Sequence, residues 1–170
     1  MREKTFLLLP SKSYYSGGAT DLTTKVLTLP LSQKQIMQII PHRSPSLFID
    51  KILELEPGQK AIGVYRVKEG DCEGHFPDNP IMPGFKILEI MNQIGAVALL
   101  SIPENRDKIA AIVGTDRSRF RKRVGPGDEI RAEVEKTQEG RIGRCTGKAY
   151  VNKVLVAEAE ILFTILPKEI

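Results

Sequence analysis

Cysteine and histidine are scarce in this chain, with two residues of each among 170. Cys72 and Cys145 form no C-x-x-C motif and predict no disulfide framework, so a reducing compartment is the simpler assumption. Cys72 lies three residues before His75, but with so few ligands and no paired spacing we expect neither a metal site nor a cysteine–histidine nucleophile.

Long apolar runs are missing where a targeting or membrane segment would need them. The opening MREKTFLLLPSK contains a run of only four apolar residues before Pro10, too short for the core of a signal peptide. The central apolar segment carries Lys86, Glu89, Asn92 and Gln93 in its first half, which argues against a membrane span. The net charge is only +4 and favours an acidic partner mildly. We therefore expect a cytoplasmic protein without a membrane partner.

Length and composition indicate one domain. A chain of 170 residues can enclose a full core, and 41% apolar with 27% charged residues is ordinary for a globular protein. There is no internal repeat. Residues 1–30 are rich in Ser, Thr and Gly without a sustained period, so they predict an irregular N-terminal extension, with at most a short strand at 26–29. Residues 31–170 are expected to form the domain itself.

The pattern of apolar residues predicts a short helix, two strands, a long helix and then about four strands. Ser32 and Gln35 fit a capping box for a helix that Pro41 ends. The expected elements are strands at 47–55 and 60–67, a helix at 85–100, strands at 109–123, 130–135, 144–151 and 154–166, and a tight hairpin at 152–153. Short turns between strands favour an antiparallel sheet, and a helix too apolar to face water needs that sheet curled around it. The fold class is α+β.

Glu89 stands out because it lies inside the most apolar segment, residues 85–100. Apolar side chains occupy nearly every side of that helix, which is typical of a buried helix. Burial penalises the charged form of a carboxyl group, so we expect Glu89 to hold a proton. A structural ion pair between Glu89 and Lys86 is an equally open interpretation. The proline-rich loop that carries His75 just upstream favours a functional role.

Three stretches carry a family resemblance: PHRSPSLFIDKI at 41–52, GHFPDNPIMPGFKILEIMNQ at 74–93 and RFRKRVGPGDEI at 119–130. Through them, residues from about 36 to 166 resemble the (3R)-hydroxyacyl-[acyl-carrier-protein] dehydratases of type II fatty-acid synthesis. The resemblance implies a hot-dog fold, a curved antiparallel β-sheet wrapped around one long central helix. It also implies a cofactor-free lyase that converts a (3R)-hydroxyacyl carrier-protein thioester to the trans-2-enoyl product in fatty-acid biosynthesis.

The middle motif places the family's catalytic pair on this chain. The resemblance makes His75 the base and Glu89 the acid, and it implies that each comes from a different subunit of a homodimer. A hexamer, built as a trimer of dimers, is the common assembly in this family. One departure is Asp71–Cys72, where relatives usually have aromatic residues, and it bears on the shape of the acyl pocket.

Other positions near the helix start have roles that the resemblance implies. The Gly84 amide, which follows Pro83 at the helix start, would be a donor to the oxyanion that develops on the thioester. From the residues alone, Pro83-Gly84 is also an ordinary helix start. Gln93 either orients Glu89 or is a satisfied core amide. Three apolar side chains are expected to line the acyl tunnel: Phe85, Ile87 and Leu88.

His42 and a row of arginines are weaker signals. We interpret His42 as structural, because it lies in a turn with no carboxylate at a useful spacing. Arginines at 117, 119, 121 and 123 alternate along an expected strand and would share one face. Such a row is most often a solvated face, but the resemblance implies that it docks the acidic acyl carrier protein with its phosphopantetheine-linked substrate. Nucleic acid is not expected, because no aromatic platform accompanies the arginines.

Two other functions stay open at this level. A hot-dog thioesterase would use a carboxylate to activate water against the same thioester. A non-catalytic acyl-binding module would use the fold without a reaction.

Overall fold

The computed structural model describes residues 5–8 and 25–168. In chain order its elements are β1 (Thr5–Leu8), β2 (Lys25–Thr28), β3 (Leu31–Ser32), α1 (Gln33–Ile36), β4 (Lys51–Glu56), β5 (Lys60–Arg66), α2 (Glu69–Cys72), α3 (Gly84–Leu100), η1 (Pro103–Asn105), β6 (Lys108–Phe120), β7 (Glu129–Gln138), β8 (Gly143–Val151) and β9 (Val154–Pro167). Among the described residues, seven strands form one antiparallel sheet in the order β3-β4-β5-β7-β8-β9-β6. β1 and β2 pair with each other in a separate two-stranded sheet.

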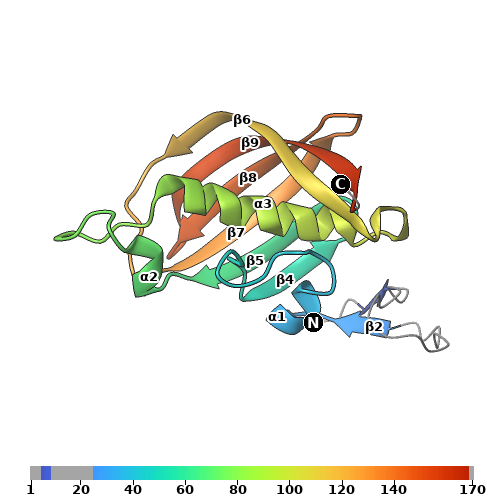
Figure 1. Cartoon of the computed structure of the whole chain (residues 1–170), viewed down its shortest axis with the longest axis horizontal. Helices are drawn as coiled ribbons and strands as arrows, with labels where there is room; N and C mark the ends of the chain where they lie inside the picture. Colours follow the sequence, from blue (N-terminus) through green and yellow to red (C-terminus); the bar gives the residue numbers. More distant parts are fainter. Residues whose placement is uncertain (1–4, 9–24, 169–170) are drawn as a thin grey trace.

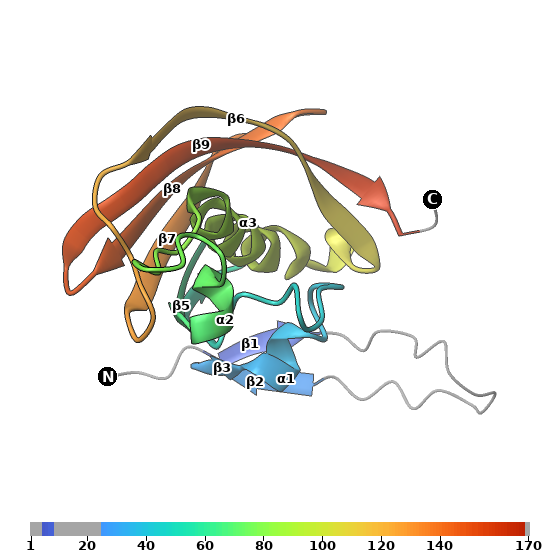
Figure 2. The ribbon, with the colours of Figure 1, turned by 60° about the vertical axis from the view of Figure 1, so that its left-hand side comes forward.

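The seven-stranded sheet is curved, and α3 lies along its concave side (Figure 1). In the turned view, β6 and β9 arch over the helix while α1 and the short strands lie on its other side (Figure 2). α3 connects β5 to β6, which is an edge strand of the sheet. The predicted hot-dog arrangement, one long helix inside a curled antiparallel sheet, is therefore confirmed.

The two halves of α3 differ in burial. From Gln93 to Leu100 every residue is buried, so the all-round apolar pattern is explained by a helix enclosed on all sides. Each fully buried Ile or Leu contributes about 1.5–3 kcal/mol through the area it removes from water. In the first half, Ile87, Ile90 and Met91 face the core while Phe85 is 67% exposed. None of the helices in the described part of the chain is long and apolar enough to cross a membrane.

Most predicted elements appear, but some boundaries differ and one short helix was missed. The predicted strand at 47–55 begins only at Lys51, because the Phe48 N–H bonds a side chain of α3 rather than a neighbouring strand. The N-terminal helix is only α1, followed by hydrogen-bonded turns to Ile40, although the Gln35 side chain accepts from the Ser32 N–H as the capping box predicts. The short helix α2 was not predicted at all.

The hairpin between β8 and β9 was predicted correctly. Asn152 and Lys153 both have positive φ, at 47° and 66°, which is the backbone that a two-residue hairpin of matching twist requires. The predicted strand near residues 26–29 corresponds to β2. Most of the predicted N-terminal extension, residues 1–4 and 9–24, lies outside the described residues.

Candidate active site

His75 lies in a loop between α2 and α3 that folds back on itself. The His75 N–H donates to Cys72 O at 2.9 Å, and His75 O accepts from the Ile81 N–H at 2.8 Å. Between His75 and Ile81, Phe76 and Asn79 form two backbone hydrogen bonds with each other, of 3.2 and 3.0 Å. The imidazole also stacks on Phe76, with ring centroids 4.4 Å apart. The loop therefore fixes both the backbone and the ring plane of His75.

One hydrogen bond defines the tautomer of His75. Its Nδ1 lies 2.9 Å from the backbone oxygen of Ile81. A carbonyl oxygen can only accept, so Nδ1 must carry the proton in this contact. In the neutral ring, Nε2 is then the nitrogen with a free lone pair. The residue is half-buried in the single chain.

Asp71 anchors α2, the element that leads into the His75 loop. Its buried carboxylate accepts from the Tyr65 hydroxyl at 2.8 Å and from the Lys68 N–H at 2.8 Å. Its backbone oxygen accepts from Lys86 Nζ at 2.7 Å. Burial raises the pKa of Tyr65, and the hydrogen bond to Asp71 raises it further, so the hydroxyl stays a donor. These bonds tie α2 to β5 and to the first turn of α3, one on each side of the loop.

Glu89 does not have the apolar surroundings that the sequence predicted. Its side chain is 29% exposed in the single chain. Oε1 accepts from Gln93 Nε2 at 2.8 Å, and Oε2 accepts from Asn92 Nδ2 at 3.2 Å. The open alternative of an ion pair with Lys86 is wrong, because Lys86 Nζ bonds Asp71 O instead.

Gln93 satisfies both interpretations given to it. The amide is fully buried, and it donates to Ser46 O at 2.7 Å while accepting from the Phe48 N–H at 2.9 Å. It also donates to Glu89, so a satisfied core amide reaches the carboxylate. The same side chain thereby joins the loop before β4 to α3.

His42 was interpreted as structural for lack of a carboxylate partner, but a carboxylate does lie beside it. Its Nε2 lies 3.6 Å from Glu89 Oε1. The two residues are 47 positions apart in the sequence, so no local spacing could reveal the contact. Asn92 was also missed as a partner of Glu89, although its position at i+3 on the same helix is the spacing at which side chains meet.

Gly84 opens α3 directly after Pro83, where the first helical N–H groups have no partner within the helix. A Cβ at Gly84 would lie 2.8 Å from the ring of Phe120, so a larger residue at this position would have to displace that ring. Phe85, the next residue, is 67% exposed, but Ile87 is buried in the core. Of the three residues predicted to line a tunnel, only Phe85 and Leu88 have accessible surface.

An open pocket of about 460 Å³ lies between α2 and the proline loop. Its lining residues are Glu69, Gly70, Cys72, Glu73, Gly74, Phe76, Pro77 and Pro80. They flank His75 on both sides, but neither His75 nor Glu89 is among them. The pocket is therefore next to the candidate site.

Neither cysteine is suited to nucleophilic chemistry. Both are buried, and burial raises the pKa of Cys72 and raises that of Cys145 to about 12. Within the described ranges, 5–8 and 25–168, no group of three or more His, Cys, Asp or Glu residues could hold a metal ion.

Comparison with known proteins identifies the family of this chain. The model of the FabA-like domain matches residues 40–160. The 3-hydroxyacyl-[acyl-carrier-protein] dehydratase FabZ of Roseiflexus sp. strain RS-1 is 54% identical over 139 residues, which cover 79% of this chain and 96% of that protein. The FabZ of Pelotomaculum thermopropionicum is 48% identical over 138 residues, covering 79% and 99%. The chain belongs to the FabA-like dehydratase family.

Solved structures share the fold of this FabA-like chain at low sequence identity. The dehydratase heterocomplex ApeI:P from Xenorhabdus doucetiae matches with a TM-score of 0.67 and 14% identity, over 83% of this chain and 93% of that one. The uncharacterized protein PH1136 from Pyrococcus horikoshii matches with a TM-score of 0.60 and 15% identity, over 81% and 95%. At this identity the likeness concerns the hot-dog fold alone.

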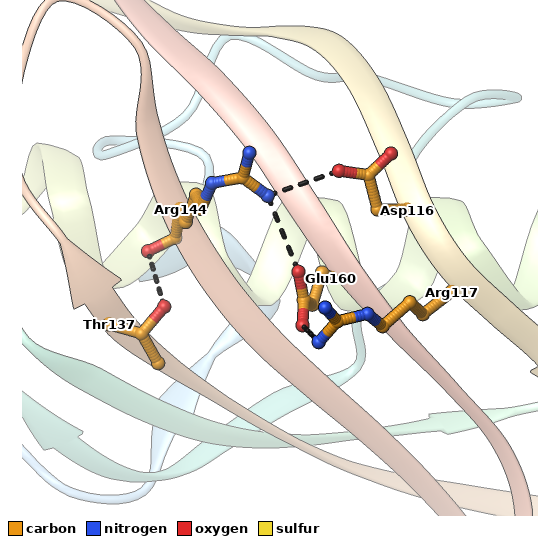
Figure 3. Close-up of polar contacts among 5 residues, drawn as sticks. All are labelled: Asp116, Arg117, Thr137, Arg144 and Glu160. Atoms are coloured by element: carbon orange, nitrogen blue, oxygen red, sulfur yellow. Dashed lines mark hydrogen bonds and ion pairs between the residues drawn. The ribbon is translucent and has the colours of Figure 1, made fainter.

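The arginine row of this FabA-like chain is not the continuous charged face that was predicted. β6 ends at Phe120, and its register with β9 shifts between Asp116 and Arg119, so the alternation of side chains is broken. Arg117 Nη1 bonds Glu160 at 2.6 Å, and Arg144 bonds Asp116 and Glu160 at 3.1 and 3.3 Å (Figure 3). Arg121 pairs with Glu158. Exposed pairs of this kind contribute little stability, but they neutralise part of the row.

Proposed function

We propose that this protein dehydrates (3R)-hydroxyacyl-[acyl-carrier-protein] to the trans-2-enoyl product, with His75 as base and Glu89 as acid. The observation that carries the proposal is the tautomer of His75, whose Nδ1–H donates to Ile81 O and leaves Nε2 bare. Imidazole is suited to general base catalysis near neutral pH. The relatives named dehydratases support the reaction class.

The reaction moves two protons and no net charge. Nε2 of His75 takes a proton from C2 of the thioester, and the electron pair of that C–H bond forms the C2=C3 double bond. The C3–O bond breaks as Glu89 gives its proton to the leaving oxygen, which departs as water. The protonated imidazole and the carboxylate that remain regain their starting states by exchange with solvent.

The thioester oxygen gains negative charge when the C2 proton leaves. We assign the Gly84 N–H, at the positive end of the α3 dipole, as the donor to that oxygen. A backbone donor in the first turn of a rigid helix costs no reorganisation during the reaction. The ring of Phe120 lies next to Gly84 at this helix start.

We propose that the catalytic pair is completed across a homodimer. Among the described residues of one chain, no hydrogen bond or ion pair joins His75 to Glu89. Phe76 and Phe85, both beside the candidate site, are 57% and 67% exposed, and exposed aromatic side chains are typical of surfaces that a partner covers. β6 is an edge strand with exposed Ile112 and Val113. A trimer of such dimers is the assembly that we expect.

Mixing two inactive variants tests the shared site. We expect co-expressed His75→Asn and Glu89→Gln chains to recover about a quarter of wild-type activity. Random pairing makes half of the dimers mixed, and each mixed dimer has one site of two with both groups intact. Each variant expressed alone is the control. No recovery in dimers shown to be mixed would contradict a site formed between subunits.

The carrier protein must reach the His75 loop to deliver its substrate. Arg117 and Arg121 are already paired with Glu160 and Glu158, so we assign the docking role to Lys122 and Arg123, beyond the end of β6. This segment lies beside the loop, since Val124 O accepts from the Met82 N–H at 2.8 Å. Two exposed cations next to the His75 loop suit an acidic carrier protein.

A spectrophotometric assay with a 3-hydroxyacyl carrier-protein thioester separates the candidate functions. A dehydratase changes the enoyl absorbance without releasing thiol, and this is the result that we expect. Release of thiol would identify a thioesterase. Binding of the substrate without either signal would identify an acyl-binding module and end the proposal.

A further inference from the structure

His42 lies in a loop whose shape is fixed by its neighbour. The Arg43 guanidinium donates to Met37 O at 2.9 Å, to Ile40 O at 3.0 Å and to His42 O at 2.7 Å. Two of these carbonyls belong to the helical turns after α1, where oxygens at a helix end need donors. Gln93 binds the far end of the same loop through Ser46 O and the Phe48 N–H. The loop is therefore held against α3 at both ends.

The tautomer of His42 is the opposite of that of His75. His42 Nδ1 is buried and has no hydrogen-bond partner among the residues that the structure describes. A proton on that nitrogen would be an unsatisfied buried donor, which is strongly unfavourable. The neutral ring therefore carries its proton on Nε2, the nitrogen that lies 3.6 Å from Glu89 Oε1.

His42 also stays neutral. Burial lowers its pKa, the Arg43 charge lowers it further, and the charge of Glu89 opposes these effects. A charged ring would need a second N–H at the buried Nδ1, where the described residues provide no acceptor. A neutral N–H donor can orient a carboxyl group without acting as its counter-ion.

The donors around Glu89 distinguish its two oxygens. Oε1 faces both Gln93 Nε2, at 2.8 Å, and His42 Nε2. The Gln93 amide cannot turn, because its other contacts to the loop backbone fix its orientation. In the described part of the chain, Oε2 bonds only Asn92, whose own Oδ1 is buried and has no partner there. If the Asn92 amide turns over, Oδ1 accepts a hydrogen bond from a protonated Oε2.

We propose that His42 is a positioning residue for Glu89, a neutral imidazole whose Nε2–H is aimed at Oε1 and leaves Oε2 as the oxygen that carries the transferable proton. This inference rests on the proposed role of Glu89 as the acid. The separation of 3.6 Å is longer than a hydrogen bond, and such contacts in active sites often tighten only when substrate is bound.

A matched pair of substitutions tests the position of the donor. The amide nitrogen of His42→Gln can occupy the place of Nε2, whereas that of His42→Asn falls near Nδ1. We expect His42→Gln to retain at least about a third of the wild-type kcat, and His42→Asn to lose about tenfold in kcat with little change in KM, the effect of one hydrogen bond to a carboxyl group. The pH profile of kcat should be the same for His42→Gln as for the wild type, because one neutral donor replaces another.

Equal losses of kcat in the two variants would overturn the proposal. So would the disappearance of one limb of the pH profile of kcat in His42→Gln. A second measurement needs neither activity nor a variant. The ¹⁵N spectrum of the resting wild-type protein should show His42 with a bare Nδ1 and a protonated Nε2, and His75 with the reverse. The opposite tautomer of His42 would end the proposal even in an active dehydratase, whereas an inactive wild-type protein would end the proposed function instead.

Discussion

Replacing His75 by Asn is expected to lower kcat/KM for dehydration by about 10²- to 10⁴-fold, the usual contribution of a general base. The Asn amide nitrogen falls near the place of Nδ1, so it can still donate to Ile81 O and preserve the loop. What the variant lacks is Nε2, the nitrogen that takes the C2 proton. The measurement is initial rate against substrate concentration, followed through the enoyl absorbance.

The control for His75→Asn is its fold. The thermal midpoint should stay close to that of the wild type, because the backbone bonds between His75 and Ile81 do not involve the ring. A low rate with a normal midpoint then reflects lost chemistry. Activity within tenfold of wild type would show that another group removes the C2 proton.

Local patterns in the sequence predicted the parts of the fold that short-range physics determines. The apolar run of α3 requires a cover on all sides, and the curled sheet supplies it along the second half of the helix. Asn152 and Lys153 adopt the positive φ values of a tight hairpin. The candidate site was predicted through the family resemblance of the motif that contains His75 and Glu89, not from local spacing alone.

Contacts between distant segments could not be predicted in this way. Residues 47–50 are apolar enough for a strand, but Gln93 takes the Phe48 N–H and β4 starts later. His42 meets Glu89 only because the loop before β4 crosses the first half of α3. The broken arginine row has a similar cause, since a change of register within β6 leaves no clear trace in the alternation of charges.

The exposed fraction of Glu89 also depends on contacts between distant segments, which local patterns do not reveal. A count of apolar residues treats both halves of α3 alike, but in the single chain the sheet encloses only the second half. Two N–H donors, from Asn92 and Gln93, therefore meet a carboxyl group that is partly open to solvent. In the proposed dimer, the partner subunit would supply the missing cover together with its own His75.

Replacing Glu89 by Gln is expected to lower kcat by about 10²- to 10⁴-fold with little change in KM, because the variant binds substrate but has no proton to give to the leaving oxygen. The new amide fits the site. Its oxygen can accept from Gln93 as Oε1 does. Its NH₂ group, at the place of Oε2, faces Asn92 Nδ2, so it can donate to Asn92 Oδ1 only after the Asn92 amide turns over. Stability should therefore be preserved, and a normal thermal midpoint is the control.

Two further variants distinguish loss of the acid from loss of shape. Glu89→Asp keeps a transferable proton but has a side chain that is one methylene shorter. Its kcat should therefore fall less than that of Glu89→Gln. The double variant of His75→Asn with Glu89→Gln should be little slower than either single variant, because residues that act as one unit are not additive. If Glu89→Gln retained more than a tenth of wild-type kcat, or if the two losses multiplied in full, Glu89 would not be the acid that acts together with His75.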